Sequence, residues 1–185
     1  MRATAAALAL TALAACSNGS AKGDDPLPMI AIDACPAPQD LLTTPPTQGK
    51  RLPDVKLRCL GHDGEVSMRL LGATPTVVNL WGSWCFPCRT EMPEFQKVHK
   101  ALEGKVRFLG VDTKDYERPA RNAIQNAGIS YANVFDPDEH IKRSVNARSL
   151  PTTILVGADG LIKNVHVGQL TGEELRGLIT KYLNV

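Results

Sequence analysis

The sequence contains no long hydrophobic run and no surplus of charge of either sign. No apolar stretch approaches the ~20 residues that a helix needs to cross a bilayer, which excludes internal membrane-spanning helices. The 21 Lys and Arg residues nearly balance the 19 Asp and Glu residues, and the formal net charge is +2. This balance leaves no broad positive surface for nucleic acid, so we expect no nucleic-acid partner.

The composition that is present is that of one globular domain. The 185 residues are 43% apolar and 22% charged, with only 5% aromatic residues, a balance typical of folded chains. This length suits a single domain of ordinary size rather than two packed domains. No internal repeat is found. Residues 17 to about 50 are rich in Ser, Gly, Pro and Thr, which favours a tether and an extended arm.

The first residues have the features of an export signal. Arg2 precedes an uncharged stretch of Ala, Leu and Thr over residues 3–15, which is typical of a cleaved signal peptide. The sequence Leu13-Ala14-Ala15-Cys16 resembles the lipobox of bacterial lipoproteins, in which cleavage precedes the cysteine and the cysteine is acylated. The alternative is a soluble secreted or periplasmic protein in which Cys16 merely lies near the cleavage site.

These features predict three segments. Residues 1–15 form a signal peptide, residues 16–50 a lipidated tether and extended arm, and residues 51–185 the folded domain. The mature protein is then expected at the extracytoplasmic face of the cell membrane, held there by its lipid anchor.

Five cysteines are an odd number for an exported protein, and lipidation of Cys16 removes the odd one. Cys35, Cys59, Cys85 and Cys88 remain, and in an oxidising compartment they can form two disulfides in three possible pairings. Cys85 and Cys88 form a C-x-x-C motif, so pairing these two leaves Cys35 with Cys59 by elimination. A zinc site of four thiolates is the alternative, but Cys35 and Cys59 supply no second C-x-x-C.

Hydrophobic periodicity predicts an α/β domain. The domain begins with a β-hairpin and continues with a strand, a helix, a strand and a helix. This order implies a parallel βαβ unit. A second hairpin follows, and then a terminal helix that begins with a T-x-x-E capping box. The expected strands are residues 55–59, 66–70, 76–81, 106–111, 152–156 and 161–167. The first expected helix begins within the C-x-x-C motif at residues 85–88 and is stopped by Gly104, and the others run from Pro119 to Ala127 and from Thr171 to the end.

The C-x-x-C motif lies where a buried strand ends and a helix begins. The unpaired backbone N–H groups and the dipole of a helix N-terminus favour thiolate over thiol, and such cysteines have pKa values of roughly 3.5–7.5. We therefore expect Cys85, flanked by the flat Trp84, to be the exposed nucleophile. Cys88, one turn inside the helix, is expected to be the shielded resolving thiol. A purely structural disulfide is the alternative.

Two motifs resemble the thioredoxin superfamily, and within it the bacterial TlpA/ResA-like thiol-disulfide oxidoreductases, also described as AhpC/TSA-related or DsbE-like. They are VVNLWGSWCFPCRTEMP at residues 77–93 and SLPTT at residues 149–153, and the likeness extends over about residues 51–185. The resemblance implies a thioredoxin fold, with a central mixed β-sheet flanked by helices and an N-terminal β-hairpin extension. It also implies that Pro151 is a cis-proline packed beside the disulfide, and that the backbone around Leu150 pairs with an extended substrate segment.

The sequence departs from thioredoxin itself at the residue that moves the proton of the resolving cysteine. Thioredoxin has a buried aspartate at the strand position of Asn79, which cannot titrate. TlpA/ResA-like proteins carry instead a glutamate three residues after the second cysteine, and Glu91 occupies that position. A spacing of three places Glu91 and Cys88 on one side of a helix, so a partly buried Glu91 with a raised pKa is expected to exchange the proton. The alternative is a solvated glutamate in the first turn.

These observations predict an exported, membrane-tethered enzyme that exchanges disulfides with protein substrates through Cys85 and Cys88. The resemblance implies a reductant in cytochrome c maturation, fed by a membrane thiol-electron carrier, or alternatively an extracytoplasmic oxidant that forms disulfides. We expect a monomer with no cofactor. We also expect no metal, because the four histidines share no ligand spacing.

Two further function classes remain open. Peroxiredoxins share the fold, but they require Thr three residues before the peroxidatic cysteine, and Cys85 holds that place before Cys88. A Cu(I)- or haem-delivery protein would bind soft metal through the paired thiolates. The sequence places no His or Met beside the pair, although Met92 can approach it in space.

Overall fold

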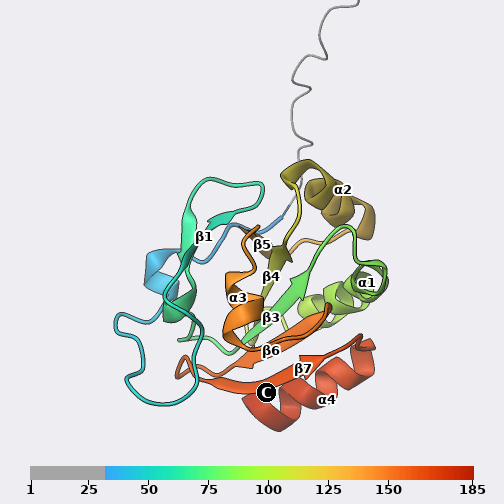
Figure 1. Cartoon of the computed structure of the whole chain (residues 1–185). Coiled ribbons are helices and arrows are strands. Elements are labelled where there is room, and N and C mark those ends of the chain that lie inside the picture. Colours follow the sequence, from blue (N-terminus) through green and yellow to red (C-terminus); the bar gives the residue numbers. More distant parts are fainter. Residues whose placement is uncertain (1–31) are drawn as a thin grey trace, which may run out of the picture.

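The structure, a computed structural model, describes residues 32–185. Within these residues a seven-stranded sheet is covered by helices on both faces (Figure 1). The strands are β1 (Lys56–Cys59), β2 (Glu65–Ser67), β3 (Thr76–Trp81), β4 (Arg107–Thr113), β5 (Ala132–Asp136), β6 (Thr152–Val156) and β7 (Ile162–Val167). The helices are α1 (Phe86–Ala101), α2 (Glu117–Ala127), α3 (His140–Ser144) and α4 (Gly172–Leu183), with short 3₁₀ turns η1 (Pro38–Asp40) and η2 (Met68–Leu70).

The sheet is mixed, with strand order β2-β1-β5-β4-β3-β6-β7. Strands β3, β4 and β5 are parallel at its centre, while the β6–β7 hairpin pairs antiparallel with β3 and the β1–β2 hairpin pairs antiparallel with β5. Every residue of β3 is buried, as expected for a parallel strand covered on both faces. The predicted βαβ unit and both predicted hairpins are therefore confirmed.

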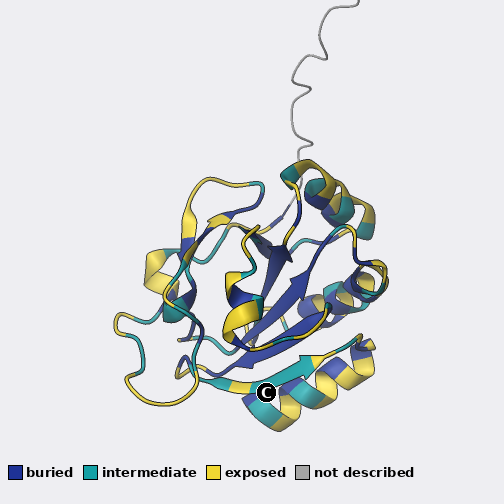
Figure 2. Cartoon of the chain, in the orientation of Figure 1, coloured by how far each residue is buried: buried dark blue, intermediate teal, exposed yellow. Residues whose placement is uncertain are grey.

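The two faces of the sheet carry separate hydrophobic cores because side chains alternate along each strand. Val77 and Trp81 face the core that α1, α2 and α4 cover. Val78 and Leu80 face the opposite core, which is closed by α3, by the first hairpin and by the arm before residue 55. Figure 2 shows the central strands buried, with the exposed residues on the helices and loops around them.

Two elements were not predicted from the sequence. Strand β5 carries polar residues at Asn133 and Asp136, so its hydrophobic run is short. Helix α3 has five residues and begins after Glu139, whose φ is +57°, so it lacks both a full hydrophobic period and a standard N-cap. The predicted second strand of the first hairpin also ends early, at Ser67, where the chain turns into η2.

The arm lies against the domain from its first described residue. Ile32 and Leu41 are buried, the Leu42 N–H donates to the Leu70 carbonyl at 2.9 Å, and the Ile162 N–H donates to the Lys50 carbonyl at 2.7 Å. Cys35 and Cys59 form a disulfide that joins the arm to the end of β1.

The predicted signal peptide and the predicted lipidation site Cys16 lie outside the described residues. No helix among residues 32–185 has both the length and the apolarity needed to cross a bilayer.

Candidate active site

The site is built at the carboxyl end of β3, where the chain turns directly into α1. The Cys85 N–H donates to the Gly82 carbonyl at 3.0 Å, which closes a tight turn. Cys85 is then the N-cap of α1, and its Sγ accepts the Cys88 N–H at 3.3 Å. One of the otherwise unpaired N–H groups of the helix N-terminus therefore points at the Cys85 sulfur, which is the arrangement that stabilises a thiolate.

Cys85 and Cys88 are joined in a disulfide, with their Cα atoms 5.3 Å apart. Cys85 retains 5% of its surface exposed, while Cys88 has none. In this oxidised state the cysteine predicted as the nucleophile is therefore itself largely buried. An attacking thiolate can approach the pair from solvent only on the Cys85 side, because the Cys88 sulfur is covered by the core of α1 and its neighbours.

A hydrogen-bonded clasp holds the turn before Cys85 against the loop that follows β4. The Asp115 carboxylate accepts hydrogen bonds from the Ser83 backbone N–H and, at 2.9 Å, from the Ser83 hydroxyl. The Trp84 indole N–H donates to the Lys114 carbonyl at 2.9 Å. A Cβ on Gly82 would come within 2.7 Å of the Trp84 indole nitrogen, so any larger residue there would displace the indole from this position.

Glu91 is 1% exposed and lies in α1 three residues after Cys88, so it is not the solvated glutamate of the alternative interpretation. Its Oε1 accepts the Asn79 side-chain N–H at 2.9 Å, and its Oε2 accepts the Leu170 backbone N–H at 3.0 Å. Burial raises the pKa of Glu91 to about 7, and the hydrogen bonds from Leu170 and Asn79 limit that rise. A carboxyl group with this pKa can both accept and donate a proton at neutral pH.

Pro151 follows a cis peptide bond from Leu150. Strand pairing places it at the site, because Leu80 of β3 lies opposite Thr152 of β6, which puts Pro151 level with the end of β3. Leu150 is half-buried and packs against both hydrophobic cores. The structure thus brings the two sequence motifs together at one edge of the sheet.

Exposed aromatic side chains surround the turn that carries the disulfide. Trp84, Phe86 and Tyr116 are 56%, 72% and 80% exposed, which is unusual for side chains of this size and typical of surfaces that contact a partner. The sequence pattern singled out Trp84 alone. Phe86 lies inside the C-x-x-C motif. Tyr116 follows Asp115 and comes to this surface because the loop after β4 is bonded to the turn before Cys85.

Sequence reasoning also missed Asp115 and Leu170. The signal for Asp115 is its position two residues after a buried parallel strand, since the carboxyl ends of parallel strands meet at the edge where ligands bind. Leu170 contributes through its backbone N–H, so no property of its side chain could have indicated the role.

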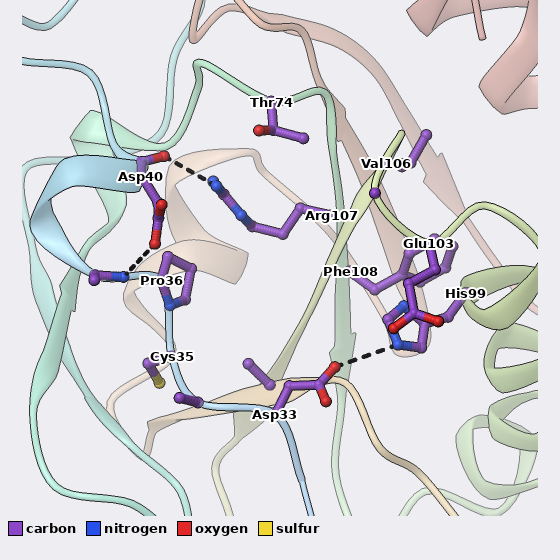
Figure 3. A pocket seen from close by; sticks show the side chains of 14 residues that line it. Asp33, Cys35, Pro36, Asp40, Thr74, His99, Glu103, Val106, Arg107 and Phe108 are labelled. Atoms are coloured by element: carbon purple, nitrogen blue, oxygen red, sulfur yellow. Dashed lines mark hydrogen bonds and ion pairs between the residues drawn. The ribbon is translucent and has the colours of Figure 1, made fainter.

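The Cys35–Cys59 disulfide lies away from this site, beside a cavity of about 450 Å³. Figure 3 shows the cavity between the arm, which contributes Cys35 and Asp33, and the start of β4 at Arg107. Because β3 and β4 are parallel, the start of β4 and the end of β3 lie at opposite ends of the strands. The cavity is therefore remote from the Cys85–Cys88 pair. Among residues 32–185, no cluster of three or more His, Cys, Asp or Glu is arranged to hold a metal ion.

Comparison with known proteins gives consistent matches. The sequence profile of the AhpC/TSA family matches residues 48–165, more than half of the chain. The thioredoxin-like protein YneN of Bacillus subtilis is 28% identical over 69% of this chain and 76% of its own length. The thiol:disulfide interchange protein DsbE of Xylella fastidiosa is 34% identical over 66% of this chain and 62% of its own.

Among solved structures, a DsbF homologue from Corynebacterium diphtheriae superposes with a TM-score of 0.64 at 25% identity. The match covers 81% of this chain and 98% of that protein. The predicted thioredoxin fold is therefore confirmed.

Proposed function

The chain belongs to the AhpC/TSA family and is a thiol-disulfide oxidoreductase of the ResA and DsbE type, and we propose that it exchanges disulfides with exported proteins through Cys85 and Cys88. The observation that carries this proposal is the disulfide at the N-terminus of α1, with Cys88 fully covered and Cys85 alone reaching the surface. A structural disulfide has no need of that asymmetry, of a helix N-terminus or of a neighbouring carboxyl group near its working pKa.

In the reductive direction, the Cys85 thiolate attacks one sulfur of a substrate disulfide, and the other substrate sulfur leaves as a thiolate. The Cys88 thiol then loses its proton to the Glu91 carboxylate and attacks the Cys85 sulfur, which releases the second substrate thiolate. The substrate gains two electrons, and Cys85 and Cys88 lose two to form their disulfide. The released thiolates take protons from Glu91 and from solvent.

Substrate recognition follows from the surface around the disulfide. An extended substrate segment pairs with the backbone at Leu150, before the cis-proline Pro151, in the manner of an added strand. The aromatic side chains of Trp84, Phe86 and Tyr116 are exposed and contact the apolar residues of the substrate. Their exposure supports a protein substrate rather than a small peroxide.

We place this activity outside the cytoplasm, with the chain anchored through an acylated Cys16. Two disulfides among the described residues support an oxidising compartment. The role that fits a ResA- and DsbE-type enzyme is reduction of the haem-attachment cysteines of apocytochrome c, with a membrane thiol-electron carrier returning electrons to Cys85 and Cys88. Labelling with a palmitate analogue tests the anchor: the wild type takes up label, and Cys16→Ser does not.

Two measurements test the activity and its direction. The wild type is expected to reduce insulin disulfides with dithiothreitol as the electron source, whereas Cys85→Ser is expected to be inactive. Equilibration of the Cys85–Cys88 pair with glutathione buffers then gives its reduction potential. A potential well below that of glutathione supports the reductive role, and a potential near that of a strong oxidant contradicts it. Equal insulin reduction by wild type and Cys85→Ser would refute the assignment of the nucleophile.

A further inference from the structure

A second buried carboxyl group lies beside the active-site turn and takes no part in the mechanism above. Asp112 is the penultimate residue of β4 and lies opposite Trp81, the last residue of β3, in the parallel pairing. Phe108 faces the core under α1, and Leu109 and Val111 face the other core. By alternation, Asp112 faces the α1 side, which is the side that contains Cys85 and Cys88.

Asp112 is fully buried, and no donor group among residues 32–185 gives its carboxyl oxygens a hydrogen bond. Its hydrogen-bonding neighbour is the carboxylate of Asp115, to which Asp112 can donate only while it is protonated. An ionised carboxylate in that position would be strongly destabilising, so the group is held in its neutral form. Burial raises the pKa of Asp112 to about 9, and the negative charge of Asp115 contributes further to the increase.

Asp115 is the acceptor of the clasp that holds Ser83, and it also accepts the Tyr116 N–H at 2.7 Å. A second negative charge beside it would repel its carboxylate. Of the charged groups on the packed elements, Glu91 of α1 is bound by Asn79 and Leu170, Glu117 and Arg121 of α2 pair with each other, and Asp136 of β5 is bound by His140. The charge that contributes to the raised pKa of Asp112 is that of Asp115. Asp115 is therefore the charged group that an ionised Asp112 would repel.

We propose that Asp112 is a positioning residue that must stay protonated for the Asp115–Ser83 clasp to hold Cys85 at the N-terminus of α1. The inference rests on the proposed function, because it concerns the reactivity of that cysteine. While Asp112 is neutral, the turn before Cys85 stays closed, and the Cys85 sulfur keeps the N–H of Cys88 as its donor. When Asp112 ionises, two carboxylates face each other, Ser83 is released, and the thiolate of Cys85 loses its fixed position.

The test compares reduced wild type with Asp112→Asn over a pH series. The rate of alkylation of Cys85 by iodoacetamide, followed by mass spectrometry, is expected to reach a plateau and then change again near pH 9 in the wild type. Asparagine keeps the shape and neutrality of the protonated acid but cannot ionise. Asp112→Asn should therefore match the wild type at neutral pH and lack the alkaline change. An alkaline change that persists unaltered in Asp112→Asn overturns the proposal.

Two further variants separate positioning from a general packing role. Asp115→Asn removes the carboxylate that an ionised Asp112 would repel, so the alkaline change should be lost in this variant; an alkaline change that persists near pH 9 contradicts the proposal. Asp112→Leu keeps neutrality and loses the polar group. Its insulin reduction at neutral pH should fall on the order of tenfold, as for one pKa unit in a thiolate, and Asp112→Asn should restore it. Equal activity in both variants contradicts a polar role for Asp112.

Glu91→Gln distinguishes the two proposals. It should slow insulin reduction while leaving the alkaline change in Cys85 alkylation in place. If the wild type reduces insulin but Asp112→Asn keeps the alkaline change, the role of Asp112 alone is overturned. A wild type that is inactive towards insulin refutes the function itself, whatever happens near pH 9.

Discussion

The buried carboxyl group of Glu91 should make the stability of the protein depend on pH in an unusual direction. Its pKa is raised from 4.5 to about 7 by burial, and each pKa unit corresponds to about 1.4 kcal/mol. The unfolded chain therefore loses the Glu91 proton at a lower pH than the folded chain. Between the two pKa values the folded state binds more protons, so this group makes the free energy of unfolding fall as pH rises, by about 3 kcal/mol in all.

Replacing Glu91 with Gln removes this contribution while leaving an amide that can still accept the Leu170 N–H. We expect Glu91→Gln to be more stable than the wild type at about pH 8, by up to about 3 kcal/mol, and close to it at about pH 5. Denaturant unfolding at both pH values measures the difference. Glu94→Gln is the control: Glu94 is a half-buried residue on the same helix, its side chain is 42% exposed and pairs with Lys97, and the change should alter the pH dependence little.

The same substitution should slow disulfide exchange, because the Cys88 proton then has no buried acceptor. Greater stability together with lower activity is the expected signature of a group retained for its chemistry. If Glu91→Gln and Glu94→Gln show the same pH dependence of unfolding, Glu91 does not hold a proton in the folded state. The assignment of its role would then be wrong.

The remaining predictions concern the frame around the site. Gly110→Ala would place a Cβ 1.8 Å from the Asn133 side-chain oxygen and should destabilise by about 2 kcal/mol or more in thermal unfolding; an unchanged melting temperature would contradict this packing. Replacing both Cys35 and Cys59 with Ser opens a loop with a sequence separation of 24 and should cost about 3 kcal/mol while insulin reduction persists. Thr171→Ala removes the capping box of α4 and should cost about 1 kcal/mol, measured by denaturant unfolding.

Most elements of the fold were predictable because their signals are local. The run at residues 76–81 is apolar and β-branched, and the Thr171–Glu174 capping box begins α4 where the pattern places it. Helix α2 was predicted from Pro119 but begins at Glu117. The N–H groups of a first turn have no partner within the helix, so proline is tolerated at any position of that turn and does not mark its first residue. Strand β5 and helix α3 were missed because they are short and carry no complete hydrophobic period.

The location of the redox chemistry follows from local sequence patterns. A buried strand, a C-x-x-C motif and a helical repeat follow one another within one stretch of chain, so local geometry alone places Cys85 at a helix N-terminus. The surroundings of Glu91 and Asp112, by contrast, depend on contacts between distant parts of the chain. The partner of Glu91 at Leu170 is 79 residues away, and Asp112 meets the turn before Cys85 through strand pairing. The pKa of a carboxyl group depends on its burial, and its burial depends on which distant residues pack over it. Hydrophobic periodicity does not indicate which residues those are.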